Sequence, residues 1–212
     1  MSVRRTRIAV GLGTLVLAAT TLVTVAPMPA AAAGPVTIQL LNINDFHGRI
    51  EKDAGIGQSN TVKFAGTVEG LRATDGATGA NTLLLSAGDN IGASLFPSFI
   101  ADDQPTIDVL NALELDGSAV GNHEFDQGFE DLQNDVIAGG TNAQWAYLGA
   151  NVYQKGTTTP ALEEYEIFTV AGVRVGVIGV VTSETPTLVS PGGITTVDFG
   201  DPVDAVNRVA AQ

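Results

Sequence analysis

Short apolar runs alternate along the chain with segments in which apolar residues recur every three or four positions. The runs lie at residues 36–41, 82–85, 118–120 and 173–181, and their composition predicts buried strands. Three other segments have helical spacing. Their predicted apolar faces are Phe64, Ala65, Val68 and Leu71 after a cap at Ser59 or Asn60; Ile107, Leu110 and Leu113 after Pro105; and Phe129, Leu132 and Val136. This alternation predicts an α/β fold with helices packed on a sheet.

A hairpin is predicted in the second half of the chain. Residues 165–170 and 174–180 are both β-rich, and Ala171 and Gly172 form the turn between them. Because a hairpin pairs its strands in antiparallel fashion, the sheet structure is expected to be mixed.

The last residues predict an amphipathic helix that opens at Asp201 and Pro202. Its expected apolar stripe runs through Val203, Val206, Asn207 and Ala210. The pattern is still continuing when the sequence reaches Gln212. We therefore expect the chain to be a truncated gene product or a fragment of a longer protein.

The first 33 residues have the features of an export signal. Three arginines precede an apolar run at residues 8–26, and a stretch of small residues ends at Ala33. The arginines are Arg4, Arg5 and Arg7. A membrane anchor is the alternative, but the four threonines and two glycines of the run favour a removed signal peptide. We predict a secreted or cell-envelope protein of residues 34–212, with Sec or twin-arginine export left open.

Charge and cysteine content narrow the classes of partner. The 212 residues contain 10 Lys and Arg and 23 Asp and Glu, a formal charge of −13. Three of the basic residues lie in the leader, so the mature part carries −16. Such a surface repels nucleic-acid polymers and anionic membranes. The chain has no cysteine, so any metal must be bound by histidine, carboxylate, amide or water.

Polar residues follow three of the predicted strands and suggest one shared site. The first cluster contains Asp45 and His47, the second Asp89, and the third Asn122 and His123. Ligands of open α/β sheets bind beyond the carboxyl ends of the strands, where such loops meet. Both histidines of the chain fall in these clusters. Each cluster alone is also typical of a turn, an Asx-bonded loop or a helix cap, but the ordered set of three favours a functional site.

The same clusters resemble a known family. The strings NDFHG, LLLSAGDNIGAS and AVGNHEFDQG are similar to motifs of the binuclear metallophosphoesterase superfamily. Within it, LGANVY and GVIGVVTSETPTLVSPGG resemble the secreted 5′-nucleotidase and 2′,3′-cyclic phosphodiesterase branch. The resemblance covers residues 36–212 and implies a layered α-β-β-α sandwich with mixed sheets, here truncated at its C-terminus.

The resemblance also implies a cofactor, namely two divalent metal ions that are Mn, Zn, Co or Fe. Asp45 and His47 would bind the first ion, Asp89 would bridge both, and Asn122 would bind the second through its amide oxygen. These are hard or borderline ligands that suit such ions.

Two further residues receive catalytic roles from the resemblance. His123 would stabilise the transition state or protonate the leaving group, and Asp126 would orient its imidazole. The alternative for Asp126 is a first-turn carboxylate of a helix that begins near Gln127. The sequence identifies no substrate-binding residue.

One departure from the family concerns the remaining ligands. The family has further histidines in later segments and a C-terminal nucleotide-binding domain, whereas this sequence has no histidine after His123. We therefore expect residues 34–212 to be the N-terminal portion of a catalytic domain, inactive alone, whose parent hydrolyses phosphate monoesters of extracellular nucleotides. The alternatives are a 2′,3′-cyclic nucleotide phosphodiesterase, a nucleotide-sugar hydrolase, or a secreted binding module without catalysis.

Overall fold

The computed structural model describes residues 35–51, 60–75 and 81–212. The predicted signal peptide and the possible cap at Ser59 lie outside these residues. The chain divides into two units at Pro35, and every described helix and strand belongs to the second unit, Val36–Gln212.

The second unit is built on a four-stranded parallel sheet with the order β1-β2-β3-β4. The strands are β1 (Gln39–Ile43), β2 (Thr82–Ser86), β3 (Gly117–Ala119) and β4 (Ala146–Leu148). Parallel neighbours need crossover connections, and helices supply them. These are α1 (Asn60–Arg72) with η1 (Ala73–Asp75), then α2 (Phe96–Phe99) and α3 (Gln104–Ala112), and finally η2 (His123–Phe125), α4 (Phe129–Asp131), η3 (Leu132–Ile137) and η4 (Ala138–Gly140).

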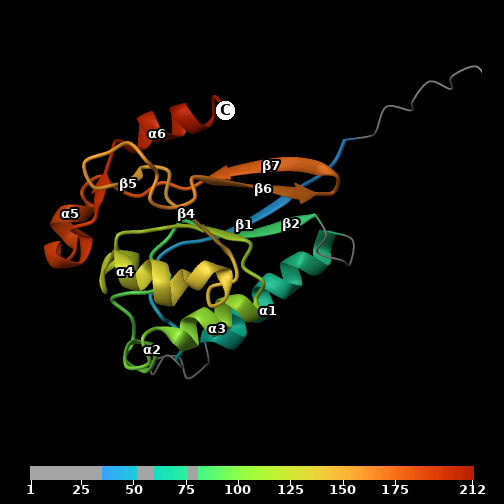
Figure 1. Ribbon diagram of the computed structural model, residues 1–212. Coiled ribbons are helices and arrows are strands. Elements are labelled where there is room, and N and C mark those ends of the chain that lie inside the picture. Colours follow the sequence, from blue (N-terminus) through green and yellow to red (C-terminus); the bar gives the residue numbers. More distant parts are fainter. Residues whose placement is uncertain (1–34, 52–59, 76–80) are drawn as a thin grey trace, which may run out of the picture. The chain divides into compact units, whose positions relative to one another are not determined.

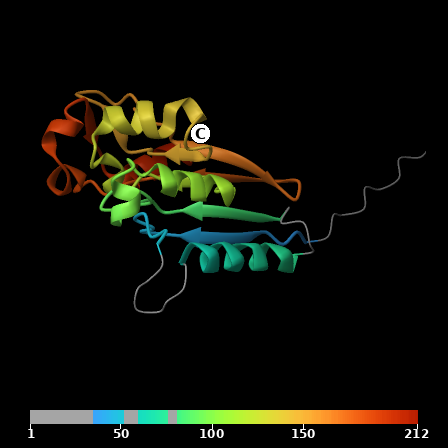
Figure 2. The same ribbon diagram turned by 90° about the horizontal axis from the view of Figure 1, so that it is seen from below.

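Two antiparallel pairs complete the strands of the described chain. They are β5 (Val152–Gln154) with β8 (Val197–Phe199), and the hairpin β6 (Tyr165–Val170) with β7 (Val173–Ile178). The remaining elements are α5 (Thr185–Leu188), η5 (Pro191–Ile194) and α6 (Pro202–Val209). Figures 1 and 2 show α1, α3 and α4 on one face of the parallel sheet and the hairpin and α6 on the other. The predicted α/β sandwich with parallel and antiparallel pairing is therefore confirmed.

The core lies between the parallel sheet and the helices that cross over it. Its fully buried side chains include Leu84 of β2, Ile107 and Leu110 of α3, Phe125 and Leu132. The helical faces predicted for α3 and for the segment after Gly128 are confirmed, although the second changes from α to π winding at Leu132. The hairpin is also confirmed, with Ala171 and Gly172 at positive φ in its turn.

Several sequence predictions about exposure were wrong. β1 is an edge strand of alternating exposure rather than a buried run, and Leu40 is 58% exposed. Leu71 lies outside the buried face of α1 and is 40% exposed. In α6, Val203 is 65% exposed while Ala205 and Val209 are buried, because these two residues face Ala150. The strands β4, β5 and β8 were not predicted.

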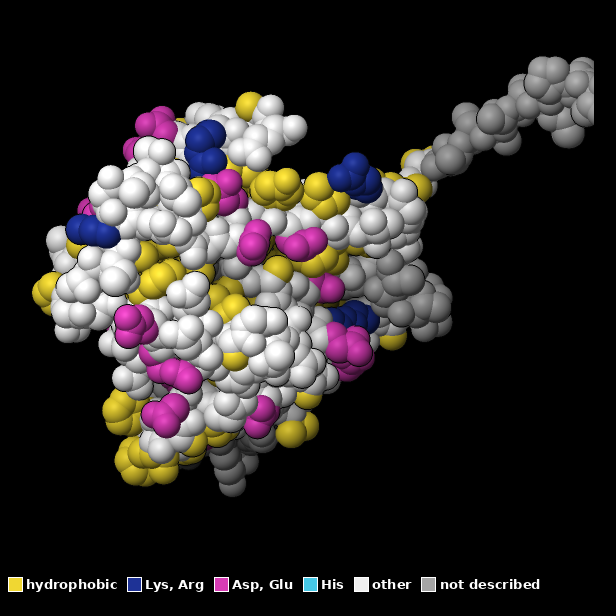
Figure 3. All heavy atoms as spheres, viewed as in Figure 1, with side chains coloured by type: hydrophobic (Ala, Val, Ile, Leu, Met, Phe, Trp, Pro, Cys, Tyr) yellow, Lys and Arg dark blue, Asp and Glu magenta, His cyan; other side chains and the backbone are white. Residues whose placement is uncertain are grey.

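The surface carries many more acidic than basic side chains. On the face drawn in Figure 3, magenta carboxylates are spread over several elements and blue cations are sparse. Among the described helices, none combines the length and the apolar character needed to cross a membrane.

Candidate metal centre

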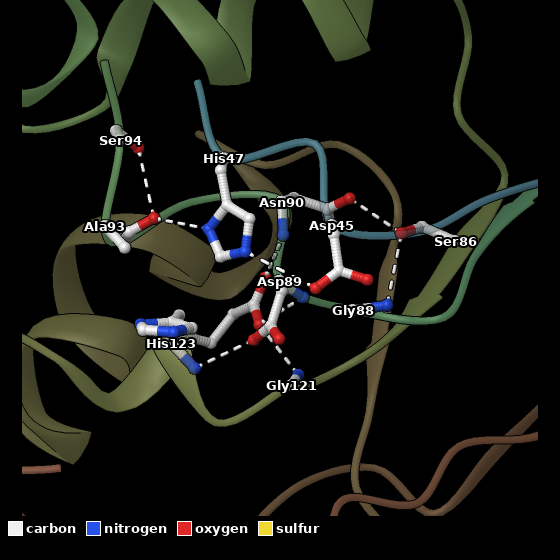
Figure 4. Close-up of polar contacts among 12 residues, drawn as sticks. Asp45, His47, Ser86, Gly88, Asp89, Asn90, Ala93, Ser94, Gly121 and His123 are labelled. Atoms are coloured by element: carbon white, nitrogen blue, oxygen red, sulfur yellow. Dashed lines mark hydrogen bonds and ion pairs between the residues drawn. The ribbon is translucent and has the colours of Figure 1, made fainter. Parts of the chain in front are cut away.

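The candidate site lies at the carboxyl ends of β1, β2 and β3, where the three loops meet (Figure 4). Backbone hydrogen bonds join the first two of these loops. Asp45 N donates to Gly88 O over 3.2 Å, and His47 N donates to Asp89 O over 3.1 Å. The loops after β1 and β2 therefore continue the pairing of the two strands beyond the sheet. His123 follows β3 and meets them from the neighbouring strand.

Three predicted site residues come together with their ligand atoms mutually close. One atom each of His47, Asp89 and His123 lies within 4.8 Å of the others, and all three residues are partly buried. The two imidazole rings meet edge to face with centroids 4.9 Å apart. Two imidazole nitrogens and a carboxylate oxygen form a donor set that suits Zn²⁺, Mn²⁺ or iron. The residues present therefore fit a divalent transition-metal ion.

Hydrogen bonds fix the tautomer of both histidines. His47 Nδ1 lies 2.8 Å from the carbonyl oxygen of Gly92, and His123 Nδ1 lies 2.8 Å from Asp126 Oδ2. Because both partners can only accept, Nδ1 carries the proton in each ring. The Nε2 lone pair of a neutral ring is then free, as in histidines that bind metals or exchange protons.

The backbone of the ligand loops is held in an uncommon conformation. Asp45, His47 and Asp89 have φ of 52°, 46° and 53°, in the left-handed region that non-glycine residues rarely adopt. Such residues cost free energy and persist where the surroundings over-determine them, frequently at functional sites. Three of the predicted ligands share this feature, which also occurs at six other described non-glycine residues.

The other predicted residues take more varied positions. Asp45 Oδ1 lies 3.4 Å from His47 Nε2, but the side chain is 53% exposed and outside the three-residue cluster. Asn122 precedes η2, and its backbone carbonyl oxygen accepts the N–H of Phe125 over 3.1 Å. Asp126 contacts His123, whereas the next helix begins only at Phe129, so the first-turn alternative for Asp126 is wrong.

The charge around His123 favours its protonated form. Burial lowers the pKa of His123, but the hydrogen bond and charge of Asp126 raise it, and the charges of Asp89 and Glu124 add to this. The net pKa of His123 in the metal-free chain lies above its ordinary value. This direction suits a group that donates a proton.

Sequence reasoning missed Glu124, whose side chain lies beneath the site. It is 1% exposed, and its carboxylate accepts the backbone N–H groups of Asp89, Asn90 and Gly121. Burial raises the pKa of Glu124 to about 7, against the lowering effect of these N–H donors. The signal available in the sequence was weak, because Glu124 lies in the polar string GNHEFD and only Phe125 beside it is apolar.

Gly121 shows how closely the loops approach. A Cβ at this position would lie 2.2 Å from Asp89 Oδ1 and 2.6 Å from Asp89 N. The backbone of the third loop thus lies against the carboxylate of the second, and only glycine leaves room for it.

Comparison with known proteins places this geometry in context. No family model matches the chain. The cell wall protein Lmo0130 of Listeria monocytogenes is 36% identical over 206 residues, which cover 86% of this chain and 26% of that protein. A 5′-nucleotidase of Vibrio cholerae is 33% identical over 178 residues, covering 82% and 31%. The chain thus spans less than a third of the length of these relatives.

Solved structures have the same fold. The NAD nucleotidase NadN of Haemophilus influenzae superimposes with a TM-score of 0.65 at 26% identity, over 82% of this chain and 31% of that one. The calcineurin-like phosphoesterase YfkN of Bacillus subtilis gives a TM-score of 0.63 at 24% identity, over 81% and 56%.

Proposed function

We propose a function on the premise that this chain belongs to the metallophosphoesterase superfamily, with 5′-nucleotidases among its relatives. Its site serves the metal-dependent hydrolysis of phosphate monoesters of extracellular nucleotides. The observation that supports this most is the convergence of His47, Asp89 and His123 within 4.8 Å at the carboxyl ends of three parallel strands. The relatives, which include 5′-nucleotidases, support the substrate class.

In this proposal, four residues hold two divalent ions, with Mn, Zn, Co and Fe as the candidates. Asp45 and His47 would hold one ion, Asn122 would hold the other, and Asp89 would contribute to both. Divalent ions bound in this way supply positive charge for phosphate oxygens and lower the pKa of water. The proximity of the Asp45, His47 and Asp89 side chains in Figure 4 supports the assignment.

His123 and Asp126 act on the leaving group. Asp126 accepts a hydrogen bond of 2.8 Å from His123 Nδ1. This bond orients the ring and stabilises its charged form. The proton on Nε2 of the charged ring is then available to the ester oxygen that departs. Asp126 also accepts the N–H of Ala93 over 3.1 Å, so the carboxylate that orients the ring is itself held.

The wider context is part of the same proposal. Residues 1–33 direct export, and residues 34–212 contribute the first portion of a catalytic domain. Further ligands and a nucleotide-binding domain belong to the parent protein, and the chain alone turns over poorly. The cell wall protein among the relatives supports the extracellular location, and the greater length of the relatives supports the further domain.

Metal binding by the purified chain is the first test. We expect calorimetry to detect Mn²⁺ binding that Asp89→Asn weakens by about tenfold or more, because the exchange removes a charged ligand. Asp108→Asn is the matched control, since Asp108 is exposed on α3 and its carboxylate accepts Gln104 Nε2 over 2.9 Å. Equal Mn²⁺ affinity in the wild type and Asp89→Asn would contradict the site.

Substrate assays separate the alternatives. AMP, 2′,3′-cyclic AMP and UDP-glucose are offered with Mn²⁺ to the chain and its Asp89→Asn variant. The monoesterase assignment is supported if the wild type releases phosphate from AMP and the Asp89→Asn variant does not. Faster hydrolysis of the cyclic ester would instead indicate a cyclic nucleotide phosphodiesterase, and faster hydrolysis of UDP-glucose a nucleotide-sugar hydrolase. Mn²⁺ and AMP binding without turnover fits a fragment or a binding module.

A further inference from the structure

The feature that carries an inference is the Glu124 carboxylate, which joins three neighbouring strands. Its Oε2 accepts Asp89 N over 2.9 Å and Gly121 N over 2.7 Å. Its Oε1 accepts Asn90 N over 2.9 Å and Tyr147 OH over 3.3 Å. These donors come from the loop after β2, the loop after β3, and β4 itself. One buried side chain therefore fixes the spacing of the loops after β2 and β3, which carry Asp89 and His123.

The bonds between the two loops are reciprocal. Glu124, from the loop after β3, accepts the backbone N–H of Asp89. Asp89, from the loop after β2, accepts the backbone N–H of His123 through Oδ1 over 2.8 Å. Each loop thus places a carboxylate on a backbone donor of the other.

We infer that Glu124 is a positioning residue that fixes Asp89 and His123 relative to each other before a metal ion binds. Asp89 needs such support, because its φ of 53° is unfavourable for a residue with a side chain. Glu124 supplies it without touching the ion or the substrate. The consequence for metal affinity rests on the proposed function, but the effect on the loops does not.

The number of acceptors explains why a carboxylate is required. Four donors face the two oxygens of Glu124, and a carboxylate offers about four lone-pair positions. The side chain of Gln has the same shape, but its NH₂ group cannot accept. Glu124→Gln must therefore place an NH₂ group against buried backbone N–H donors, either those of Asp89 and Gly121 or that of Asn90, whereas the Tyr147 hydroxyl can turn to accept.

Amide hydrogen exchange of the metal-free chain tests the inference directly. We expect Glu124→Gln to speed exchange by about tenfold or more at one of the two donor pairs, at Asp89 with Gly121 or at Asn90. The amides of the β6–β7 ladder should keep their rates, which separates a local effect from general destabilisation. Asp116→Asn is the matched control, since Asp116 accepts Leu84 N over 2.8 Å at the opposite end of β3.

Mn²⁺ affinity supplies the second measurement. Glu124→Gln is expected to weaken binding by about tenfold or more, and Asp116→Asn to leave it within about twofold. Unchanged exchange at Asp89, Asn90 and Gly121 overturns the inference, and so does faster exchange with unchanged Mn²⁺ affinity. If the wild type binds no Mn²⁺, the proposed function fails and the exchange rates alone decide. If Glu124→Gln does not fold, Glu124→Asp replaces it, because its shorter side chain cannot reach all four donors.

Discussion

Replacing Asp126 by Asn isolates the charge that acts on His123. Asp126 Oδ2 accepts both His123 Nδ1, over 2.8 Å, and Ala93 N, over 3.1 Å. An Asn carbonyl oxygen in the same place can accept both bonds, so the substitution removes the charge while it preserves the geometry. Any change in the titration of His123 then reports the charge alone.

The magnitude follows from the geometry of the pair. Both side chains are 31% exposed, so solvent screens the pair in part. A hydrogen bond to a charged group contributes about 1.5–3 kcal/mol and a neutral one about 0.5–1.5 kcal/mol. The difference of about 1–1.5 kcal/mol corresponds to about one unit of pKa. We therefore expect Asp126→Asn to lower the pKa of His123 by about one unit.

The assay is an NMR titration of the imidazole resonances in the metal-free chain. The chain has only two histidines, and His47 serves as the reference because its Nδ1 bonds Gly92 O instead. The folded pKa of His123 is raised above 6.5, so the pair stabilises the fold below pH 6.5, and this contribution is lost as pH rises through the folded pKa. Asp126→Asn should therefore reduce stability mainly at low pH. An unchanged or higher pKa of His123 in the variant would refute the reasoning.

Three other substitutions test the packing. Gly121→Ala brings a Cβ to 2.2 Å from Asp89 Oδ1, so Mn²⁺ affinity measured by calorimetry should fall by about tenfold or more, and an unaltered affinity would show that the loops are not tightly apposed. Asn151→Ala removes three hydrogen bonds of 2.7–2.9 Å made by a buried side chain and should lower the free energy of urea unfolding by about 2–4 kcal/mol. A loss under about 1 kcal/mol would contradict the presence of these three hydrogen bonds. Val203→Ser, at a 65% exposed position, should change that free energy by less than about 0.5 kcal/mol, and a larger loss would indicate that this side chain is buried.

The convergence of His47, Asp89 and His123 was easier to predict than the strands because it depends on topology. Parallel strands end at one edge of a sheet, so polar clusters after three of them meet whatever the details of packing. Asp45, His47, Asp89 and His123 could be selected on that ground. Their left-handed backbone could not, because it results from contacts between loops that are distant in the sequence.

Other features depend on neighbours that the sequence does not reveal. The strands β4, β5 and β8 have only three residues each and too little pattern to be recognised. The faces of α1 and α6 have apolar residues on both sides of their buried stripes, and tertiary contacts decide that Leu71 and Val203 stay exposed. Glu124 looks like a surface residue, since carboxylates are almost never fully buried without partners. Its four donors come together only after the loops after β2 and β3 have met beside β4.

The left-handed residues of the site also limit how its sequence can evolve. Asp, Asn and His are the side chains most enriched in this conformation after glycine, and they are also oxygen and nitrogen donors to metals. Selection for backbone shape and selection for chemistry therefore favour the same amino acids at Asp45, His47 and Asp89. In a descendant protein without the activity, most substitutions at these three positions would still cause backbone strain. Asparagine and glycine are the replacements that cause the least strain there, so the motif would remain recognisable after the activity was lost.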